Sequence, residues 1–255
     1  MSATPSPLPA VQPERDTEPH PTPILTNEQR YGLDCATSTE GKATSIALAG
    51  FVAVGRYYSM HTNMPQKNLT REEAIHLTQA GLSVFVVYQD AHNKAQDFDY
   101  GRGQEAATNA LDIAHNRIQQ PQGSAIYFAV DYDASQSDYD THIKPFFEGV
   151  NQTFTQGGSP YRVGVYGSGL ICENTKRDGL AQLFWLSQSL GFRDSRSFLD
   201  SNQWTLSQHL PQNLDGLDYD PDLINPDLRD FGQFRIYQKS GDRLSSYLNR
   251  LIEWV

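Results

Sequence analysis

Ala125-Ile126-Tyr127-Phe128-Ala129-Val130-Asp131-Tyr132-Asp133 is the stretch that decides the fold. It has the composition of a buried strand that ends in two carboxylates. Because side chains alternate between the two faces of a strand, one face is large and apolar, and the other is small and then acidic. Parallel barrel strands have this character, with helices packed outside and chemistry at the C-terminal mouth. We therefore expect Asp131 and Asp133 to point into one mouth, although aspartates at strand ends also cap helices and form turns.

Seven further segments have the composition of strands, and helix signals separate the earlier ones. Strands that alternate with helices and run in one direction predict an α/β fold, a single (β/α)8 barrel of the TIM type. The later helices are short or missing, so this barrel is expected to be irregular on that side. On the last strand, alternation places Asp218 and Asp220 on one face. The segments are Tyr31–Cys35, Phe51–Tyr58, Val84–Gln89, Tyr161–Gly167, Leu183–Ser187, Gln203–Gln208 and Gly216–Asp220.

The helix signals are specific at three places. Thr70 and Glu73 have the spacing of a capping box, in which each side chain bonds to the backbone N–H of the other residue. An alanine-rich stripe predicts a helix from about residue 103 to residue 119, after a short glycine-containing loop. Pro145 lies inside a third helical pattern and is expected to kink or split that helix.

Charge and composition exclude several classes of function. The chain has 255 residues and a formal net charge of −10, and it has no run rich in lysine and arginine. Nucleic acid and anionic membrane surfaces are therefore poor partners. No apolar stretch is long enough to span a membrane. Cys35 and Cys172 lack the spacing of a zinc site and are expected to be free thiols. We expect neither a metal nor a cofactor.

The predicted barrel is expected to span residues 30–225, and the segments on either side of it are expected to lie outside the barrel itself. Residues 1–29 are rich in proline and polar residues, lack the apolar segment of a signal peptide, and are expected to be disordered. Such a chain is expected to be made in the cytoplasm and, if exported, to leave by a route that does not read a classical signal. Residues 226–255 form an extension that is expected to pack on the barrel, with a helical stripe at Leu244, Tyr247, Leu248, Leu251 and Val255.

Several short motifs occur in an order that is similar to a known family. They are YGLDCATS, GRYYS, VYQD, IYFAVDYD, VGVYGSG, FWLSQS and GLDYD, which together cover about residues 31–224. The chain resembles the glycoside-hydrolase-like (β/α) barrel family that is related to the family 25 lysozymes, or muramidases. The resemblance implies a barrel with an acidic groove, and a reaction that hydrolyses peptidoglycan between N-acetylmuramic acid and N-acetylglucosamine.

The same resemblance implies roles for particular acids. Asp34 matches the aspartate of the first strand, Asp131 the first acid of the fourth-strand pair, and Asp218 the aspartate of the last strand. Asp133 stands where the lysozymes have glutamate and is one methylene shorter. Glycosidic cleavage needs one protonated and one ionised carboxyl group. We assign Asp133 as the general acid and Asp131 as base or electrostatic stabiliser, with Asp34 and Asp218 tuning them.

Sugars would be held by side chains expected at the mouth: Tyr57, Tyr88, Gln89, Tyr166, Trp185 and Gln208. Two alternatives stay open. The Asp-x-Asp pair could hold a divalent cation in a metal-dependent carbohydrate-active enzyme, or the barrel could bind glycans without cutting them. A cell-wall hydrolase of this kind would act in the periplasm or outside the cell, as an antibacterial effector or lysin. An inhibitor or immunity protein in the producing cell is then a further expected partner.

Overall fold

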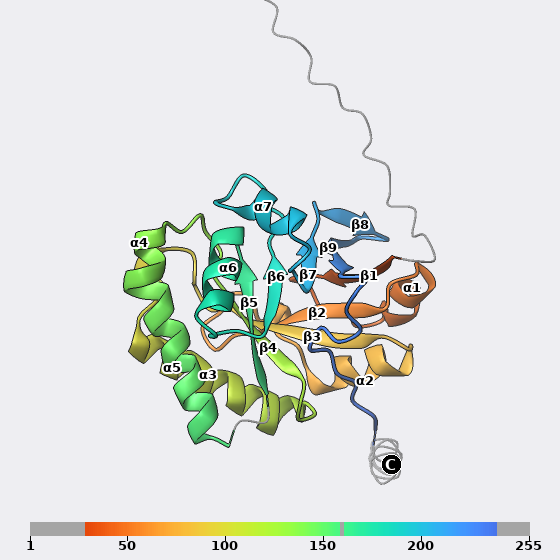
Figure 1. Ribbon diagram of the computed structural model, residues 1–255. Helices are drawn as coiled ribbons and strands as arrows, with labels where there is room; N and C mark the ends of the chain where they lie inside the picture. The colour runs from red at the N-terminus through yellow and green to blue at the C-terminus, as the bar shows by residue number, and fades with distance from the viewer. Residues whose placement is uncertain (1–28, 159–160, 239–255) are drawn as a thin grey trace, which may run out of the picture.

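The computed structural model describes residues 29–158 and 161–238. The predicted helical stripe near the C-terminus and nearly all of the predicted leader lie outside these ranges. Seven strands run parallel and lie side by side in the order of the sequence (Figure 1). They are β1 (Arg30–Asp34), β2 (Ala53–Tyr58), β3 (Ser83–Tyr88), β4 (Ala125–Ala129), β5 (Arg162–Gly167), β6 (Leu183–Leu186) and β7 (Leu206–Gln208).

The eighth strand of the barrel, β9 (Leu217–Ile224), corrects the prediction that all strands run in one direction. It lies between β7 and β1 and is antiparallel to both, so the sheet closes on itself. The reason is the connection: only the short strand β8 (Gln212–Leu214) separates β7 from β9, and it forms a hairpin with β9. A parallel return would need a crossover of a dozen or more residues. The α/β barrel is thus confirmed, with an irregular last strand.

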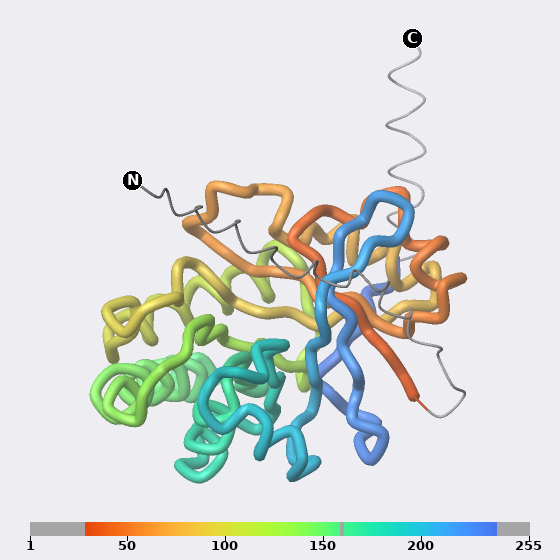
Figure 2. The backbone as a smooth tube through the Cα atoms, turned by 90° about the horizontal axis from the view of Figure 1, so that it is seen from above, coloured from red at the N-terminus to blue at the C-terminus, as the bar shows by residue number. Residues whose placement is uncertain are grey.

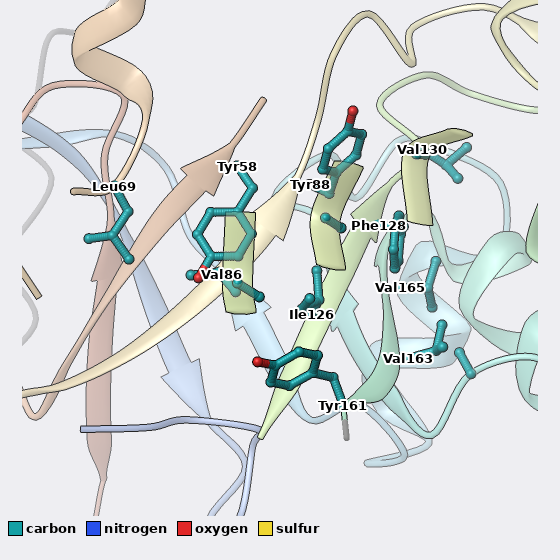
Figure 3. Packing of buried hydrophobic residues seen from close by; sticks show 14 of the residues in the cluster. Tyr58, Leu69, Val86, Tyr88, Ile126, Phe128, Val130, Tyr161, Val163 and Val165 are labelled. Atoms are coloured by element: carbon teal, nitrogen blue, oxygen red, sulfur yellow. The ribbon is translucent and has the colours of Figure 1, made fainter. Parts of the chain in front are cut away.

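Helices cover the outside of the barrel, and Figure 1 shows α3 and α5 packed side by side at its lower left. The outward faces of the strands meet these helices in one large apolar cluster, which includes Val86, Ile126, Phe128, Val163 and Val165 (Figure 3). The helices are α1 (Ala43–Leu48), α2 (Arg71–Gln79), α3 (Tyr100–Asp112), α4 (Gln136–Asp138), α5 (Lys144–Gln156), α6 (Gly169–Arg177) and α7 (Ser195–Asp200). None of the helices in the described ranges is long and apolar enough to cross a membrane.

The helix signals of the sequence are confirmed in part. Thr70 accepts the backbone N–H of Glu73, but the carboxylate of Glu73 instead binds the buried guanidinium of Arg56 at 2.9 Å. The helix at Pro145 is split, because a π-helical turn, Tyr139–Ile143, precedes α5. The stretch at residues 101–103, predicted to be a loop, lies within the first turn of α3.

The segment after β9 closes the bottom of the barrel. Phe231 is 2% exposed and belongs to the apolar cluster inside the barrel. Its carbonyl oxygen accepts a hydrogen bond of 2.8 Å from the hydroxyl of Tyr127. Gly232 follows at φ +83°, where a side chain would meet Ala125 at 2.4 Å. In the view of Figure 2 the chain returns beneath β1 to reach this position. The bottom is filled, so the open end is the mouth at the C-terminal ends of the parallel strands.

Candidate active site at the barrel mouth

Asp34 ends β1 and points into the barrel, where it is 2% exposed. Space for it is left by Gly55 on β2, since a Cβ there would lie 2.8 Å from the Cβ of Asp34. Its Oδ1 accepts a hydrogen bond from the hydroxyl of Tyr57 at 3.0 Å, and its Oδ2 accepts one from Nε2 of Gln208 at 2.7 Å. Burial, and next the charge of Asp220, raise the pKa of Asp34 to about 7.

The antiparallel strand β9 brings two more acids to Asp34. The register pairs Asp220 with Asp34 and Asp222 with Gly32, one step deeper in the barrel. Asp220 is partly exposed, and its Oδ2 accepts a hydrogen bond of 3.1 Å from the same Nε2 atom of Gln208. Burial raises the pKa of Asp220 to about 6. Gln208 therefore joins two carboxyl groups that both favour the protonated form more than a free aspartate does.

Asp222 is fully buried and forms the floor of this group. Its Oδ1 accepts the indole N–H of Trp185 at 2.8 Å, whereas no donor among the described residues reaches its Oδ2. Burial first, and then the charge of Asp34, hold the pKa of Asp222 well above its usual range, and the two carboxyl groups are hydrogen-bonding neighbours. A proton on Asp222 removes the buried charge and supplies the hydrogen bond between these two carboxyl groups.

Asp131 lies two residues beyond the end of β4 and is exposed at the mouth. Its Oδ2 accepts a hydrogen bond of 3.1 Å from Nε2 of Gln89. The side-chain oxygen of Gln89, Oε1, in turn accepts a hydrogen bond of 2.8 Å from the ammonium of Lys67. That ammonium lies 3.9 Å from the centre of the Tyr57 ring. Asp131 is thus surrounded by donors and solvent, in contrast to the buried acids on β1 and β9.

Asp133 is exposed and engaged elsewhere. The guanidinium of Arg193 forms an ion pair with its carboxylate at 3.0 Å, and the backbone N–H of Arg193 donates to its Oδ1 at 2.9 Å. Arg193 also donates to the carbonyl oxygen of Asp133 at 2.8 Å. These contacts tie the loop after β4 to the loop after β6.

The structure does not bring Asp218 to the other acids. Asp218 shares the inward parity of Asp220, but it lies one step above the rim in the β8–β9 hairpin, where it is exposed and accepts a hydrogen bond from Asn213 at 2.6 Å. Tyr88 also lies elsewhere: it is buried on the outward face of β3, and its hydroxyl donates to Asp90 at 2.5 Å. Sequence parity could have placed Tyr88 outward, since Gln89 was expected to face inward.

The remaining residues expected at the mouth do lie there, at different depths. Tyr57 and Tyr166 are partly exposed, and the hydroxyl of Tyr166 donates to Oε1 of Gln208 at 2.9 Å. Trp185 is only 1% exposed and packs edge-on against Tyr166, so it supports the mouth from below. Within the described part of the chain, no group of three or more His, Cys, Asp or Glu side chains is arranged to hold a metal ion.

Two members of this site were missed by reasoning from the sequence. Asp222 was not considered because the last strand was ended at Asp220, although the alternation of inward residues continues through Asp222 to Ile224. Lys67 belongs to a short 3-10 turn, Pro65–Lys67, in the loop after β2. No periodic pattern marks a loop residue of this kind, so only the folded arrangement identifies it.

Comparison with known proteins agrees with this architecture. Residues 44–248 match the family described as Rv2525c-like, glycoside hydrolase-like domain. FadG of Bacillus subtilis (strain 168), an uncharacterised protein, is 31% identical over 188 residues, which are 70% of this chain and 32% of that protein. YbfG of the same organism, also uncharacterised, is 32% identical over 194 residues, covering 72% of this chain and 26% of that protein. The chain thus spans about a third or less of the length of these relatives.

Solved structures share the fold at lower identity. The Tat-secreted protein Rv2525c of Mycobacterium tuberculosis superimposes with a TM-score of 0.67 at 23% identity, covering 80% of this chain and 98% of that one. The catalytic domain of endolysin ply40 from bacteriophage P40 of Listeria monocytogenes gives 0.52 at 12% identity, over 80% and 96% of the two chains. Because residues 44–248, well over half of its length, match the family model, the chain belongs to the Rv2525c-like, glycoside hydrolase-like domain family.

Proposed function

We propose that this barrel is a glycoside hydrolase that cleaves glycan strands of the bacterial cell wall. The family membership and the acidic mouth support a hydrolase of this class. Two proteins with the same fold support this substrate: the ply40 domain is the catalytic domain of an endolysin, and the structure of the modular autolysin LytC of Streptococcus pneumoniae was solved in complex with a synthetic peptidoglycan ligand. LytC shares 11% identity and a TM-score of 0.51 with this chain.

The observation that carries the proposal is the contrast between two carboxyl groups at one mouth. Asp220 lies partly buried on β9, with its pKa raised to about 6, whereas Asp131 lies exposed after β4 and receives an amide N–H. A difference of this kind between a partly buried and an exposed carboxyl group is typical of an acid and its partner carboxylate in a glycosidase. We assign Asp220 as the general acid and Asp131 as the carboxylate that acts as base, nucleophile or stabiliser.

This assignment changes the role of Asp133. The sequence pointed to Asp133 as the acid, but its ion pair with Arg193 makes it a clamp between two loops. Asp34 and Asp222 lie too deep to reach a glycosidic oxygen and instead set the charge beneath Asp220. The side chains that would hold sugars are Tyr57, Gln89 and Gln208, which donate to the acids, and Tyr166, which donates to Gln208.

The test uses purified protein and peptidoglycan, with products identified by mass spectrometry. The parent and the Asp133→Asn variant should release muropeptides or glycan fragments, whereas Asp220→Asn and Asp131→Asn should release at most about a hundredth as much. The proposal is wrong if the parent binds peptidoglycan but yields no product between pH 4 and pH 8. In that case the barrel is a glycan-binding module, which the ion-paired Asp133 would also suit.

The place of action follows from the same proposal. A cell-wall substrate lies outside the cytoplasm, and Rv2525c, which shares the fold, is a Tat-secreted protein. We propose that this domain also acts beyond the cytoplasmic membrane, where an inhibitor protein would protect a producing cell. Expression in the periplasm of a sensitive bacterium should lyse the cells, and the Asp220→Asn variant expressed in the same way should not.

A further inference from the structure

We propose that Lys67 is a positioning residue that orients two arms of the acidic mouth. We use this term for two series of contacts, one through Gln89 to Asp131 and one through Tyr57 to Asp34. The inference rests on the proposed function for its effect on turnover, but the geometry stands independently. Lys67 ends the turn Pro65–Lys67 in the loop that follows β2, and its side chain is only partly exposed. Its ammonium makes two contacts, one with Gln89 and one with Tyr57, and each contact leads to a different acid.

The first arm runs through Gln89 to Asp131. A glutamine side chain has one acceptor end and one donor end. Lys67 can only donate, so it holds the carbonyl oxygen of Gln89 at 2.8 Å, and the amide nitrogen is left to donate to Asp131 at 3.1 Å. Were the amide reversed, its oxygen would face a carboxylate and its N–H₂ group an ammonium. Lys67 therefore selects the one rotamer of Gln89 that binds Asp131.

The second arm runs through Tyr57 to Asp34. The ammonium of Lys67 lies 3.9 Å from the centre of the Tyr57 ring, within the range of a cation–π contact. The hydroxyl at the far end of that ring donates to Oδ1 of Asp34 at 3.0 Å. The position of the ring therefore sets the distance between the hydroxyl and the buried acid. One side chain thus touches the two residues that orient the acids on β1 and after β4.

The charges around Lys67 agree with this position. Burial lowers the pKa of Lys67, while the charges of Asp131 and Asp34 act in the opposite direction and that of Arg56 adds to the lowering. Burial raises the pKa of Tyr166 well above its usual range, and the charges of the same two carboxylates, Asp131 and Asp34, raise it further. The ammonium is a partly desolvated charge that faces both acids, which is the arrangement expected for a group that organises them rather than for a surface lysine.

Lys176 provides a matched control. Its ammonium also donates to the oxygen of a glutamine, Gln203, and it also lies over an aromatic ring, that of Phe184, at 5.9 Å. It belongs to α6 on the outside of the barrel and contacts none of the acids at the mouth. A Lys176→Met variant removes the same kind of contacts without changing the mouth.

The first test separates kcat from KM on peptidoglycan. Lys67→Met should lower kcat about tenfold with KM changed less than threefold, because it removes a charged hydrogen bond but no side chain proposed to hold sugars. Gln89→Leu should lower kcat to a similar extent and also raise KM, since Gln89 is proposed to hold sugars as well. In the double variant kcat should fall no further than in Lys67→Met alone, because Gln89 acts on Asp131 only in the orientation that Lys67 sets. Lys67→Arg should restore part of the rate, and Lys176→Met should match the parent. The proposal is overturned if the kcat losses of the two single variants multiply in the double variant, or if Lys67→Met changes KM but not kcat.

A second measurement needs no turnover, so it distinguishes failure of this inference from failure of the proposed function. The titration of the Lys67 side chain is followed by NMR in protein labelled at lysine, with its signal assigned from Lys67→Met. Asp131→Asn should lower the midpoint of Lys67, because the carboxylate that stabilises the ammonium is gone, and the exposed Asp218→Asn should not. An unchanged midpoint in Asp131→Asn refutes the link between the two residues, whether or not the parent cleaves glycan.

Discussion

Replacing the buried Asp222 with asparagine should stabilise the protein at neutral pH. Asparagine keeps the oxygen that accepts the indole N–H of Trp185, and it places an amide donor where the Oδ2 atom of Asp222 lacks a partner. The amide can then donate to Asp34, as the protonated carboxyl group does. The substitution thus fixes the protonated form that burial already favours, without changing the shape of the side chain.

The size of the effect follows from proton linkage. Asp222 has an ordinary pKa of 3.8 and a folded-state pKa well above it. Its stabilising contribution is complete below the ordinary value and is lost as the pH rises towards the folded-state value, because only the unfolded chain releases the proton there. Between those two pKa values the parent loses about 1.4 kcal/mol of stability per pH unit. One amide hydrogen without an acceptor subtracts about 1 kcal/mol.

The stability gained by the variant should therefore grow as the pH rises above 4, and each kcal/mol of it should raise Tm by about 2–4 °C. At pH 4 the gain should vanish, since the unfolded carboxyl group is then largely protonated as well. Urea unfolding and calorimetry at pH 4, 5, 6 and 7 measure the trend. Asp218→Asn is the matched control, with the same chemical change on the same strand but in solvent. A variant that is less stable than the parent by the same amount at every pH would show that Asp222 is ionised in the folded protein.

The other predictions concern catalysis and the ion pairs. Asp220→Asn should lower kcat on peptidoglycan by about a hundredfold to ten-thousandfold. The rate of the parent should fall as the pH rises above about 6, where Asp220 loses its proton. A parent rate that stays constant to pH 8 would contradict this role of Asp220. Incubation with EDTA should leave the rate unchanged, and a loss that a divalent ion restores would favour the metal-dependent alternative. Asp133→Asn should change the unfolding free energy by less than about 1 kcal/mol, because its ion pair with Arg193 is largely exposed. Arg56→Met should cost about 3–5 kcal/mol in urea unfolding, since it leaves the carboxylate of Glu73 buried without its partner.

The barrel could be predicted from sequence because each strand carries its own signal. In β4, the alternation that put Phe128 outward and Tyr127 inward is what the structure shows. The direction of β9 could not be inferred in the same way, because a strand has the same alternation in either direction. Direction depends on the length of the connection, and the hairpin strand β8 was not recognised as the reason that no crossover fits there.

The site was predictable to the extent that acids lie at strand ends. Asp131 was placed at the mouth by parity and Asp34 by the family resemblance, and both lie there. Parity does not give the height of a residue along the barrel axis. In β9 the three acids have the same parity, but Asp218 lies above the rim, Asp220 at the mouth and Asp222 in the interior. The partner of Asp133 could not be foreseen either, since Arg193 is 60 residues away and its contact depends on how two loops pack.

The pairing of β1 with β9 gives the barrel a seam between segments that are far apart in the sequence. Until β9 arrives, β1 and β7 each present an unpaired edge, and such edges associate readily with other chains. Phe231 and Gly232 fill the bottom only after that seam is closed, because they follow β9 in the chain. Folding must therefore bring residues 30–34 together with residues 217–224 over a long loop, which favours slow closure late in synthesis. Fusions or truncations near residues 217–238 would expose those edges and favour aggregation over a stable open sheet.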